Sequence, residues 1–377
     1  MMVPALLAAY VWLASPYIGA DGGSGSDGRC SVVVYECGME GYDTFRIPAV
    51  ARCADGTLLA FAEGRRYGAS DAGDIDIVVR RSSDDGRTWG EMEVVWDDGG
   101  NTCSNPVPVV DRLDGRIVLV MSWNRGDGSE TDILYGRSAD SRRVFVCESH
   151  DDGKTWSVPR EITSEVKLPS WTWYATGPCH AIQLSSRPYR GRIVVPCDHA
   201  VTVEGAPKYN AHLIYSDDGG RTWHIGAVAD GGNETTVAEV RGGDIVVNTR
   251  WQQGEGRFAR HTAVSSDGGA SISPMRRDTA LVEPVCQGVL LARSYRGGAA
   301  RRIYFCNPAS RRRERLTLRR SDDAGRTWNT CTVLTEGPAA YSDMTLLRGG
   351  GVGVLYETGA KSPYERIVFE RVERDCL

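Results

Sequence analysis

Four arginines stand within or at the ends of short apolar segments. Arg46 lies inside one such segment, and Arg65, Arg250 and Arg313 flank three others. Clustered guanidinium groups repel one another unless an anion neutralises them, and they bind carboxylate or phosphate groups in a bidentate manner. The sequence therefore predicts an anion site, provided that the fold brings these arginines together. Taken singly, each would be an ordinary solvated surface residue.

A repeated octapeptide indicates which fold must position them. The pattern Ser-x-Asp-x-Gly-x-Thr-Trp begins at Ser82, Ser149, Ser216 and Ser321, and a degenerate copy begins at Ser265. In a tight turn between strands, Asp and Ser bond backbone amides, Gly takes a positive φ and Trp covers the hairpin with apolar area. The alternative of a calcium loop is disfavoured, because the copies lack the bidentate Glu at the twelfth loop position.

Between the octapeptides lies a second repeat, in which two apolar strands are joined by a turn that contains Gly. It occurs six times, at residues 46–64, 105–123, 177–199, 235–250, 288–307 and 341–357. A third strand leads into each octapeptide and a fourth leaves it. Four strands in each of six units predict an all-β fold, a six-bladed β-propeller with four-stranded antiparallel blades. We expect residues 31–35 to supply the outer strand of the sixth blade and so close the ring.

Strand direction predicts the face on which chemistry occurs. Strands alternate in direction within a blade, so the start of the first, the end of the second and the start of the third share one face. The octapeptide turns lie on the opposite face. The residues expected at the mouths of the hairpins are Arg46, Arg65, Trp123, Arg250, Arg313, Tyr341 and Glu357.

Composition and the N-terminal segment bear on partners and location. The net charge of -5 provides no basic field for nucleic acid. Residues 3–14 are apolar and a flexible segment follows, which is typical of a secretory signal. An uncleaved anchor is the alternative, but the run is shorter than the ~20 residues that span a bilayer. We expect a signal and linker over 1–29, a catalytic domain over 30–377, and a secreted, cell-surface or periplasmic protein without stable membrane insertion.

The chain has 11 cysteines, which is many for a reduced cytosolic protein. None lies in a Cys-x-x-Cys pair of the kind found in zinc or redox sites. Disulfides with one thiol left over would fit export. The alternative is a set of buried free cysteines in a large β core.

Several motifs together resemble those of the exo-α-sialidases (neuraminidases) of the bacterial and animal Asp-box superfamily. The resemblance covers nearly everything after residue 30. It is carried by the octapeptides and by Phe45-Arg46-Ile47-Pro48, Asp74-Ile75-Asp76-Ile77-Val78, Tyr174-Ala175-Thr176-Gly177-Pro178, Val237-Ala238-Glu239-Val240 and Ala340-Tyr341-Ser342. The family's frequent Gly-Pro-Gly is here Gly177-Pro178-Cys179.

The resemblance implies an arginine triad that holds the carboxylate of sialic acid. Arg46 and Arg250 match its first two members. The third lies in the run 311–315, where the Arg-x-x-Leu pattern favours Arg313. Glu357 resembles the carboxylate that steadies the first arginine, and Arg65 would reach the substrate carboxylate or a neighbouring hydroxyl.

The same resemblance implies the reacting groups. Asp71 matches the acid/base residue, Tyr341 the nucleophile, and Glu239 the base that removes the tyrosine proton, although Glu239 lies within its strand, near the turn. A neutral Tyr avoids the repulsion that a carboxylate nucleophile would meet at the anomeric carbon of sialic acid. The expected reaction is hydrolysis with retention through a tyrosyl intermediate, and it requires no metal or organic cofactor.

Two further contacts and two alternatives complete the prediction. Asn105 is a plausible contact for the N-acetyl side and Trp123 could wall the pocket; either could equally be plain turn or core structure. A trans-sialidase would use the same residues, and a non-catalytic propeller that binds sialoglycans would need only the arginines. We expect a monomer whose partners are sialylated glycoproteins, glycolipids or oligosaccharides.

Overall fold

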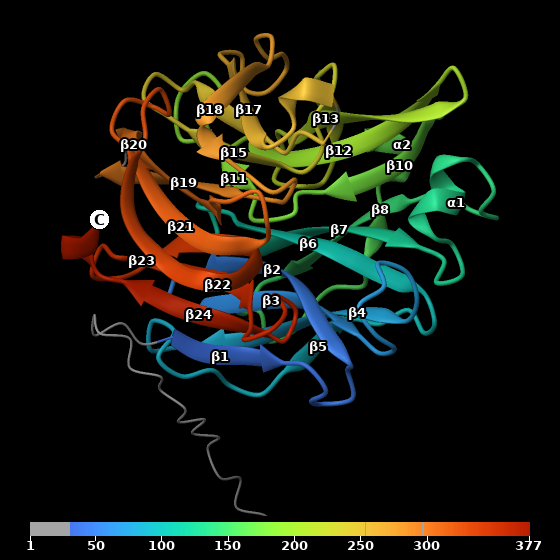
Figure 1. Cartoon of the computed structure of the whole chain (residues 1–377), viewed down its shortest axis with the longest axis horizontal. Coiled ribbons are helices and arrows are strands. Elements are labelled where there is room, and N and C mark those ends of the chain that lie inside the picture. Colours follow the sequence, from blue (N-terminus) through green and yellow to red (C-terminus); the bar gives the residue numbers. More distant parts are fainter. Residues whose placement is uncertain (1–30, 253, 296–297) are drawn as a thin grey trace, which may run out of the picture.

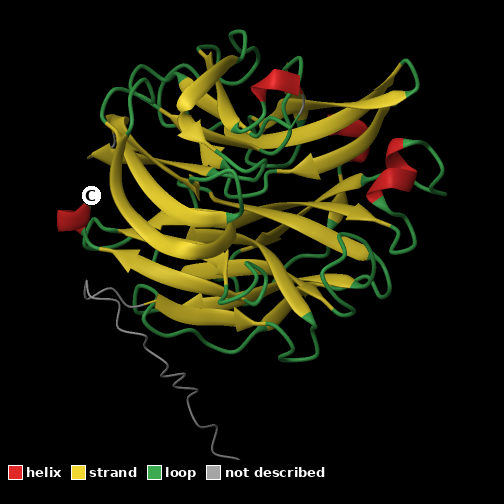
Figure 2. Ribbon diagram, viewed as in Figure 1, coloured by secondary structure: helices red, strands yellow, loops and turns green. Residues whose placement is uncertain are grey.

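Strands rich in valine, leucine and isoleucine dominate the computed structural model, which describes residues 31–252, 254–295 and 298–377. Figure 1 shows them as blades arranged around a central axis, and Figure 2 shows how little helix there is. The first three blades comprise β2 (Thr44–Arg52), β3 (Leu58–Arg65), β4 (Ile75–Ser82) and β5 (Glu93–Trp96); β6 (Thr102–Val110), β7 (Ile117–Asn124), β8 (Arg143–Ser149) and β9 (Arg160–Glu161); and β10 (Trp171–Thr176), β11 (Ile182–Gln183), β12 (Ile193–Val203), β13 (Ala206–Ser216) and β14 (His224–Val228).

The remaining blades are joined by one long strand. They comprise β15 (Thr235–Glu239), β16 (Ile245–Thr249), β17 (Ala259–Ser265) and β18 (Arg276–Val282); β19 (Val289–Tyr295), β20 (Gly298–Pro308), β21 (Glu314–Ser321) and the first part of β22 (Asn329–Leu346); and the rest of β22, β23 (Val352–Thr358), β24 (Arg366–Val372) and β1 (Ser31–Glu36). Up to Pro338, β22 pairs with β21, and from Ala339 it pairs with β23. The helices are short: α1 (Glu130–Leu134), α2 (Thr163–Val166), and the 3-10 turns Gly254–Gly256 and Arg374–Cys376.

The N-terminal strand closes the ring, as predicted. β1 pairs antiparallel with β24, so the sixth blade draws its outer strand from the start of the described chain. Buried apolar clusters fill the spaces between successive blades: Leu59 and Leu119 share one, Val120 and Val195 the next. The six-bladed propeller with four-stranded antiparallel blades is therefore confirmed, and its core lies between the blades.

The octapeptide turns have the predicted geometry. The Asp84 carboxylate accepts hydrogen bonds from the backbone N–H of Arg87 (3.0 Å) and Thr88 (2.9 Å), and the Ser82 hydroxyl accepts one from Gly86 N–H (2.8 Å). The bond from the backbone N–H at the Thr88 position recurs in the other copies, including the degenerate one, where Ser271 takes the place of Thr. The carboxylates thus bind the backbone of their own turns, which accounts for their repetition without a calcium ion.

The octapeptide tryptophans do more than cover a hairpin. Trp89 of the first blade packs edge-on against Phe369 of the sixth, with ring centroids 5.2 Å apart, and Trp156 of the second blade packs against Phe61 of the first (5.8 Å). In these two copies the repeated residue therefore joins neighbouring blades.

The disulfide expectation was wrong for the described residues. All ten cysteines among them are free, and seven, including Cys103, Cys147 and Cys197, are buried. They pack as small apolar residues in the clusters between blades, as the alternative predicted. Cys30 and the predicted signal and linker lie outside the described residues. Within the part that is described, no helix is long and apolar enough to span a bilayer.

Candidate functional site

A cavity of about 410 Å³ opens where the predicted hairpin mouths converge. Every blade contributes to its lining: in blade order these residues include Arg46, Asn105, Asp198, Glu234, Arg313 and Tyr341. Five arginines and five carboxylic acids line it in all. The cavity is therefore lined by charged groups of both signs.

Three arginines from the first, fourth and fifth blades meet around Tyr341. The guanidinium carbons of Arg46 and Arg313 lie 5.0 and 5.5 Å from the Tyr341 ring centroid. Arg250 Nη1 donates to the Tyr341 hydroxyl over 3.3 Å. The structure thus brings together, around one tyrosine, the three arginines that sequence analysis proposed.

Glu357 holds the first of these arginines. Its carboxylate accepts hydrogen bonds from Arg46 Nε (3.1 Å) and Nη2 (3.3 Å), and from the backbone N–H of Ile47 and Tyr341. Both Arg46 and Glu357 are buried. By contrast, no carboxylate within the described residues pairs with Arg313, whose Nη1 donates instead to the Tyr364 hydroxyl over 2.6 Å. Arg313 is therefore available to an incoming anion.

Glu234 is the partner of Tyr341. The tyrosine hydroxyl donates to Glu234 Oε1, and Arg250 Nη1 donates to Glu234 Oε2 over 2.7 Å. Both Tyr341 (6% exposed) and Glu234 (9%) are nearly buried. Burial, followed by the charge of Glu234, raises the pKa of Tyr341 well above its ordinary value, although Arg250 and Arg313 act in the opposite direction. The free protein thus holds a neutral phenol beside a carboxylate that can accept its proton.

The expectation that Glu239 contacts Tyr341 was wrong. Glu239 ends β15 at the opposite end from Glu234, and its carboxylate accepts from Ser185 N–H (2.8 Å) and hydroxyl (2.7 Å) and from Ser186 N–H (2.9 Å). The four strand residues Thr235 to Ala238 lie between the two glutamates, which places them at different ends of the blade. The strand-direction argument would have selected Glu234, since it immediately precedes the first strand of its blade.

A second ion-pair group lies on the first blade. Arg65 Nη2 contacts Glu63 at 2.6 Å and Asp71 at 2.8 Å, and Arg46 Nη1 lies 3.6 Å from Asp71. Asp71 is the exposed member, with 62% of its side chain accessible. Partial burial would raise its pKa, but the charges of Arg65 and Arg46 outweigh this and hold the pKa of Asp71 below its ordinary value. Asp71 is therefore an ionised, solvent-facing carboxylate at the rim.

Residues of the second and third blades form another part of the cavity wall. Asn105 lines the cavity as expected, and its side-chain oxygen accepts from Arg142 Nη2 (3.2 Å), whose guanidinium stacks 4.1 Å from the Trp173 ring centroid. The prediction for Trp123 was wrong, because strand alternation turns its ring toward Phe145 and its Nε1–H toward Asp98 (2.8 Å). Trp173 lines the cavity instead, and nothing in the sequence pattern distinguished it from a core tryptophan.

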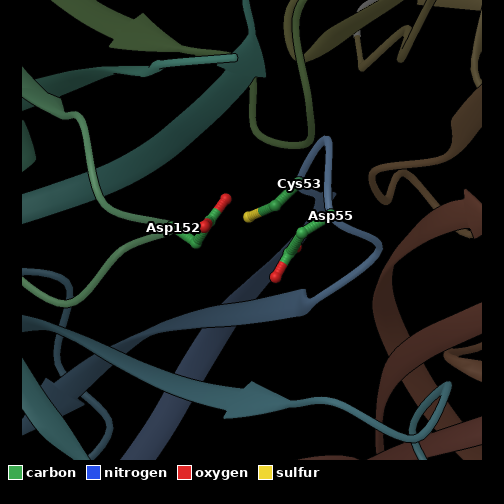
Figure 3. A group of neighbouring side chains, drawn as sticks. All are labelled: Cys53, Asp55 and Asp152. Carbon is green, nitrogen blue, oxygen red and sulfur yellow. The ribbon is translucent and has the colours of Figure 1, made fainter.

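A separate group of possible metal ligands lies at the octapeptide end of the first two blades. Figure 3 shows Cys53, Asp55 and Asp152, whose ligand atoms all lie within 4.8 Å of one another. Asp55 already accepts from the backbone N–H (2.7 Å) and hydroxyl (2.8 Å) of Thr57. Burial first, and then the two carboxylates, raise the pKa of the Cys53 thiol to about 12. The Asp55 carboxylate therefore binds residues of its own turn, between β2 and β3.

The chain is similar to several known proteins over most of its length. The model of the BNR repeat-like domain family matches residues 56–354. An exo-alpha-sialidase of Aspergillus fumigatus is 33% identical, over 88% of this chain and 84% of that protein. A sialidase of Micromonospora viridifaciens is 34% identical over 97% of this chain, which spans 58% of its length. The solved structure of a Hadza microbial sialidase superposes with a TM-score of 0.80 at 29% identity, covering 92% of this chain and 69% of that one.

Proposed function

The chain belongs to the sialidase superfamily, and we propose that it is an exo-α-sialidase, a glycoside hydrolase that removes terminal α-linked sialic acid from glycoconjugates. The observation that carries the proposal is the convergence of Arg46, Arg250 and Arg313 on the hydrogen-bonded pair Tyr341 and Glu234. An anion site built around an activated phenol suits a sugar whose reacting carbon bears a carboxylate.

The three arginines would bind that carboxylate. Arg313 has no acidic partner among the described residues, and Arg250 and Arg46 each keep one side toward Tyr341. Bidentate guanidinium contacts would hold the anomeric carbon beside the Tyr341 oxygen. Part of the binding energy would thus be used to orient the two reacting atoms. Glu357 is a positioning residue, since it acts only through Arg46 and the local backbone.

In the first step, Tyr341 Oη attacks the anomeric carbon while its proton passes to Glu234. The bond from that carbon to the leaving oxygen breaks, and Asp71 gives its proton to this oxygen. A neutral phenol approaches the substrate carboxylate without charge repulsion, and Glu234 removes the proton only as the new bond forms. The product of this step is a tyrosyl glycoside.

In the second step, water attacks the same carbon and Asp71 accepts its proton. The bond to Tyr341 breaks and Glu234 returns the proton to the phenolate. Two inversions give net retention of configuration. The arginines stabilise the substrate carboxylate throughout, while positive charge develops on the ring.

Asp71 must be protonated to act first as an acid. In the free protein Arg65 and Arg46 keep its pKa low. A bound substrate carboxylate would neutralise part of the charge on Arg46, so binding itself would raise the pKa of Asp71. Substrate binding would thereby favour the protonated form of Asp71 that the first step requires.

One assay tests the proposal. Release of a fluorogenic leaving group from an α-linked sialoside would be measured for the wild type and for Tyr341→Phe, and NMR would identify the first anomer formed. We expect turnover by the wild type, loss of at least about 10³-fold in the variant, and the α-anomer first. Equal turnover would refute the tyrosine mechanism, whereas binding without any turnover would favour a non-catalytic propeller. Added lactose distinguishes transfer from hydrolysis by the product.

A further inference from the structure

Two arginines outside the cavity have no acidic partner. Arg257 follows the 3-10 turn Gly254–Gly256, and Arg311 lies in the connection between β20 and β21. Both residues are exposed. Among the side chains that the structure describes, no carboxylate pairs with either, and each contacts an aromatic ring instead. Arg257 and Arg311 are called the basic rim below.

One ring holds the two arginines of the basic rim together. The guanidinium carbon of Arg257 lies 4.5 Å from the Phe258 ring centroid, and that of Arg311 lies 5.5 Å from it. The face of an aromatic ring attracts cations, so Phe258 gathers a charge from the fourth blade and one from the fifth. The two like charges repel each other, and an anion bound by both would relieve this repulsion.

The arginines next to Arg311 in the chain differ from it. Arg312 pairs with Glu314 at 3.3 Å, and Arg315 pairs with Glu336 at 3.4 Å. The chain as a whole has a net charge of -5. The basic rim is therefore a local excess of positive charge on an acidic protein, and its own neighbours do not neutralise it.

Both segments of the basic rim also contribute to the cavity. Arg311 precedes the cavity residue Arg313 by two positions. Arg257 lies in the connection between β16 and β17, which also contains the cavity residues Arg250 and Gln252. The basic rim therefore belongs to the same two connections that bring two of the three site arginines to the mouth of the cavity.

The chemistry of the substrate indicates which group reaches this side of the mouth. In the proposed function, the leaving oxygen and the carboxylate are bonded to the same carbon. The sugar on the other side of that oxygen therefore begins beside the arginines that bind the carboxylate. It lies outside the cavity, because Asp71, which would protonate the oxygen, is exposed at the rim.

Contacts within the site connect Asp71 to the fifth blade. Arg46 lies 3.6 Å from Asp71 and its guanidinium carbon is 4.3 Å from the Tyr364 ring centroid. The Tyr364 hydroxyl in turn accepts from Arg313 over 2.6 Å. The second sugar thus has the Asp71 carboxylate on one side and the segment of Arg313 and Arg311 on the other. A negative charge on this sugar is repelled by the first and attracted by the second.

We propose that the basic rim binds a second anionic group, carried by the sugar to which the released sialic acid is attached. The preferred substrates are then sialosides in which that sugar is itself a sialic acid or bears a sulfate. The proposal rests on the proposed function and deepens it by naming the class of substrate.

Three substrates distinguish these possibilities. The first is sialyllactose, in which the second sugar is neutral; the next is the same trisaccharide with a sulfate on its galactose; and the last is lactose that carries two sialic acids in series. The double variant Arg257→Gln/Arg311→Gln removes both charges of the basic rim. Its matched control is Arg276→Gln/Arg277→Gln, which removes the same charge from two exposed arginines of the outer strand β18.

We expect Arg257→Gln/Arg311→Gln to lower kcat/KM about fivefold or more on at least one anionic substrate and less than about twofold on the neutral one. A loss with the disialyl substrate alone identifies a carboxylate as the second anion, and a loss with the sulfated substrate alone identifies a sulfate. Salt screens exposed charges, so a higher ionic strength should lower the wild-type kcat/KM more on that anionic substrate than on the neutral one. The control variant should match the wild type on all three.

Several results would overturn the role of the basic rim. They are an equal loss on neutral and anionic substrates, no loss on any, an equal loss in the control variant, and a wild type that cleaves neither anionic substrate. In each case the proposed function stands if the wild type hydrolyses neutral sialyllactose. Absence of wild-type turnover on all three substrates overturns both proposals. Thermal midpoints close to that of the wild type would show that both double variants are folded.

Discussion

Tyr341 and Glu234 lie 107 positions apart in the chain, on the sixth and fourth blades, and the tyrosine hydroxyl donates a hydrogen bond to the Glu234 carboxylate. Arg250 Nη1 contacts both the Tyr341 hydroxyl and the Glu234 carboxylate. In the proposed mechanism this contact fixes where the tyrosine proton goes, so it makes Glu234 the residue on which turnover should depend.

Glu234→Gln should therefore reduce kcat by at least about 10²-fold, because glutamine cannot take the Tyr341 proton. The matched control is Glu239→Gln at the end of β15, the strand that Glu234 precedes. Among the described residues, the Glu239 carboxylate accepts hydrogen bonds only from Ser185 and Ser186. We expect it to lower the thermal midpoint and to leave kcat within about threefold. Steady-state kinetics of the two folded variants would give both values of kcat. A larger loss of kcat in Glu239→Gln than in Glu234→Gln would contradict the assignment of Glu234 as the base.

Arg313 offers a test of the anion site. Arg313→Met should raise KM and lower kcat/KM by about 10²-fold or more, because it removes the arginine of the triad that has no acidic partner in the described structure. Arg312→Met is the control, since the Arg312 side chain is 82% exposed and, among the described residues, pairs only with Glu314. Comparable kinetic effects of the two variants would contradict the assignment of the third arginine to Arg313.

The fold followed from the sequence because its signals repeat. The six repeated hairpins give the number of blades, and the four full octapeptides mark the turn between the third and fourth strands of a blade. A closing strand at the N-terminus was expected because the edge of the sixth blade must be covered, and the structure has it at Ser31–Glu36. Arg46, Arg250 and Arg313 were found because strand ends on one face must meet. Glu234 was missed although the same rule points to it, since the family motif drew attention to Glu239.

Other parts of the site depend on side-chain direction, which a sequence does not specify. Trp123 and Trp173 both stand in strands near the mouths, and only the alternation and twist of each strand decide which ring faces the cavity. Asp198 had no local pattern of any kind. It lines the cavity opposite Ala175 and Ala211, which become its neighbours only in the folded blade.

The pH dependence of kcat/KM should reflect the ionisation of Asp71. The first step requires protonated Asp71, so kcat/KM falls as the pH rises through the pKa of this group in the free protein. Removing the positive charge of Arg65 raises that pKa, and the falling limb in Arg65→Gln should move to higher pH by about one unit. Arg66→Gln is the control, because Arg66 pairs with Asp74 and Asp76 and not with Asp71. A limb that stays in place, or moves to lower pH, would rule out Asp71 as its origin.

The octapeptide carboxylates should matter for stability and not for turnover. Asp218 accepts bonds from the backbone N–H of Arg221 (3.0 Å) and Thr222 (2.9 Å) and from the Thr222 hydroxyl (2.7 Å), so Asp218→Ala should lower the free energy of unfolding by about 2 kcal/mol. Asp217→Ala, in the same turn, removes only a pair between the exposed Asp217 and Arg192 and should cost about 1 kcal/mol or less. Urea unfolding gives both values, and KM should be unchanged in each.

The same turn predicts how stability depends on pH. Although burial acts against it, hydrogen bonding by Thr222 and Ser216 lowers the pKa of Asp218 to about 2, whereas the unfolded chain has an Asp pKa of about 3.9. The folded pKa is the lower one, so this stabilisation is fully present above about pH 4 and is lost as the pH falls toward 2. The difference in unfolding free energy between wild type and Asp218→Ala should therefore shrink between pH 5 and pH 2. A difference that stays constant over this range would mean that Asp218 stabilises the blade through its shape and not through its charge.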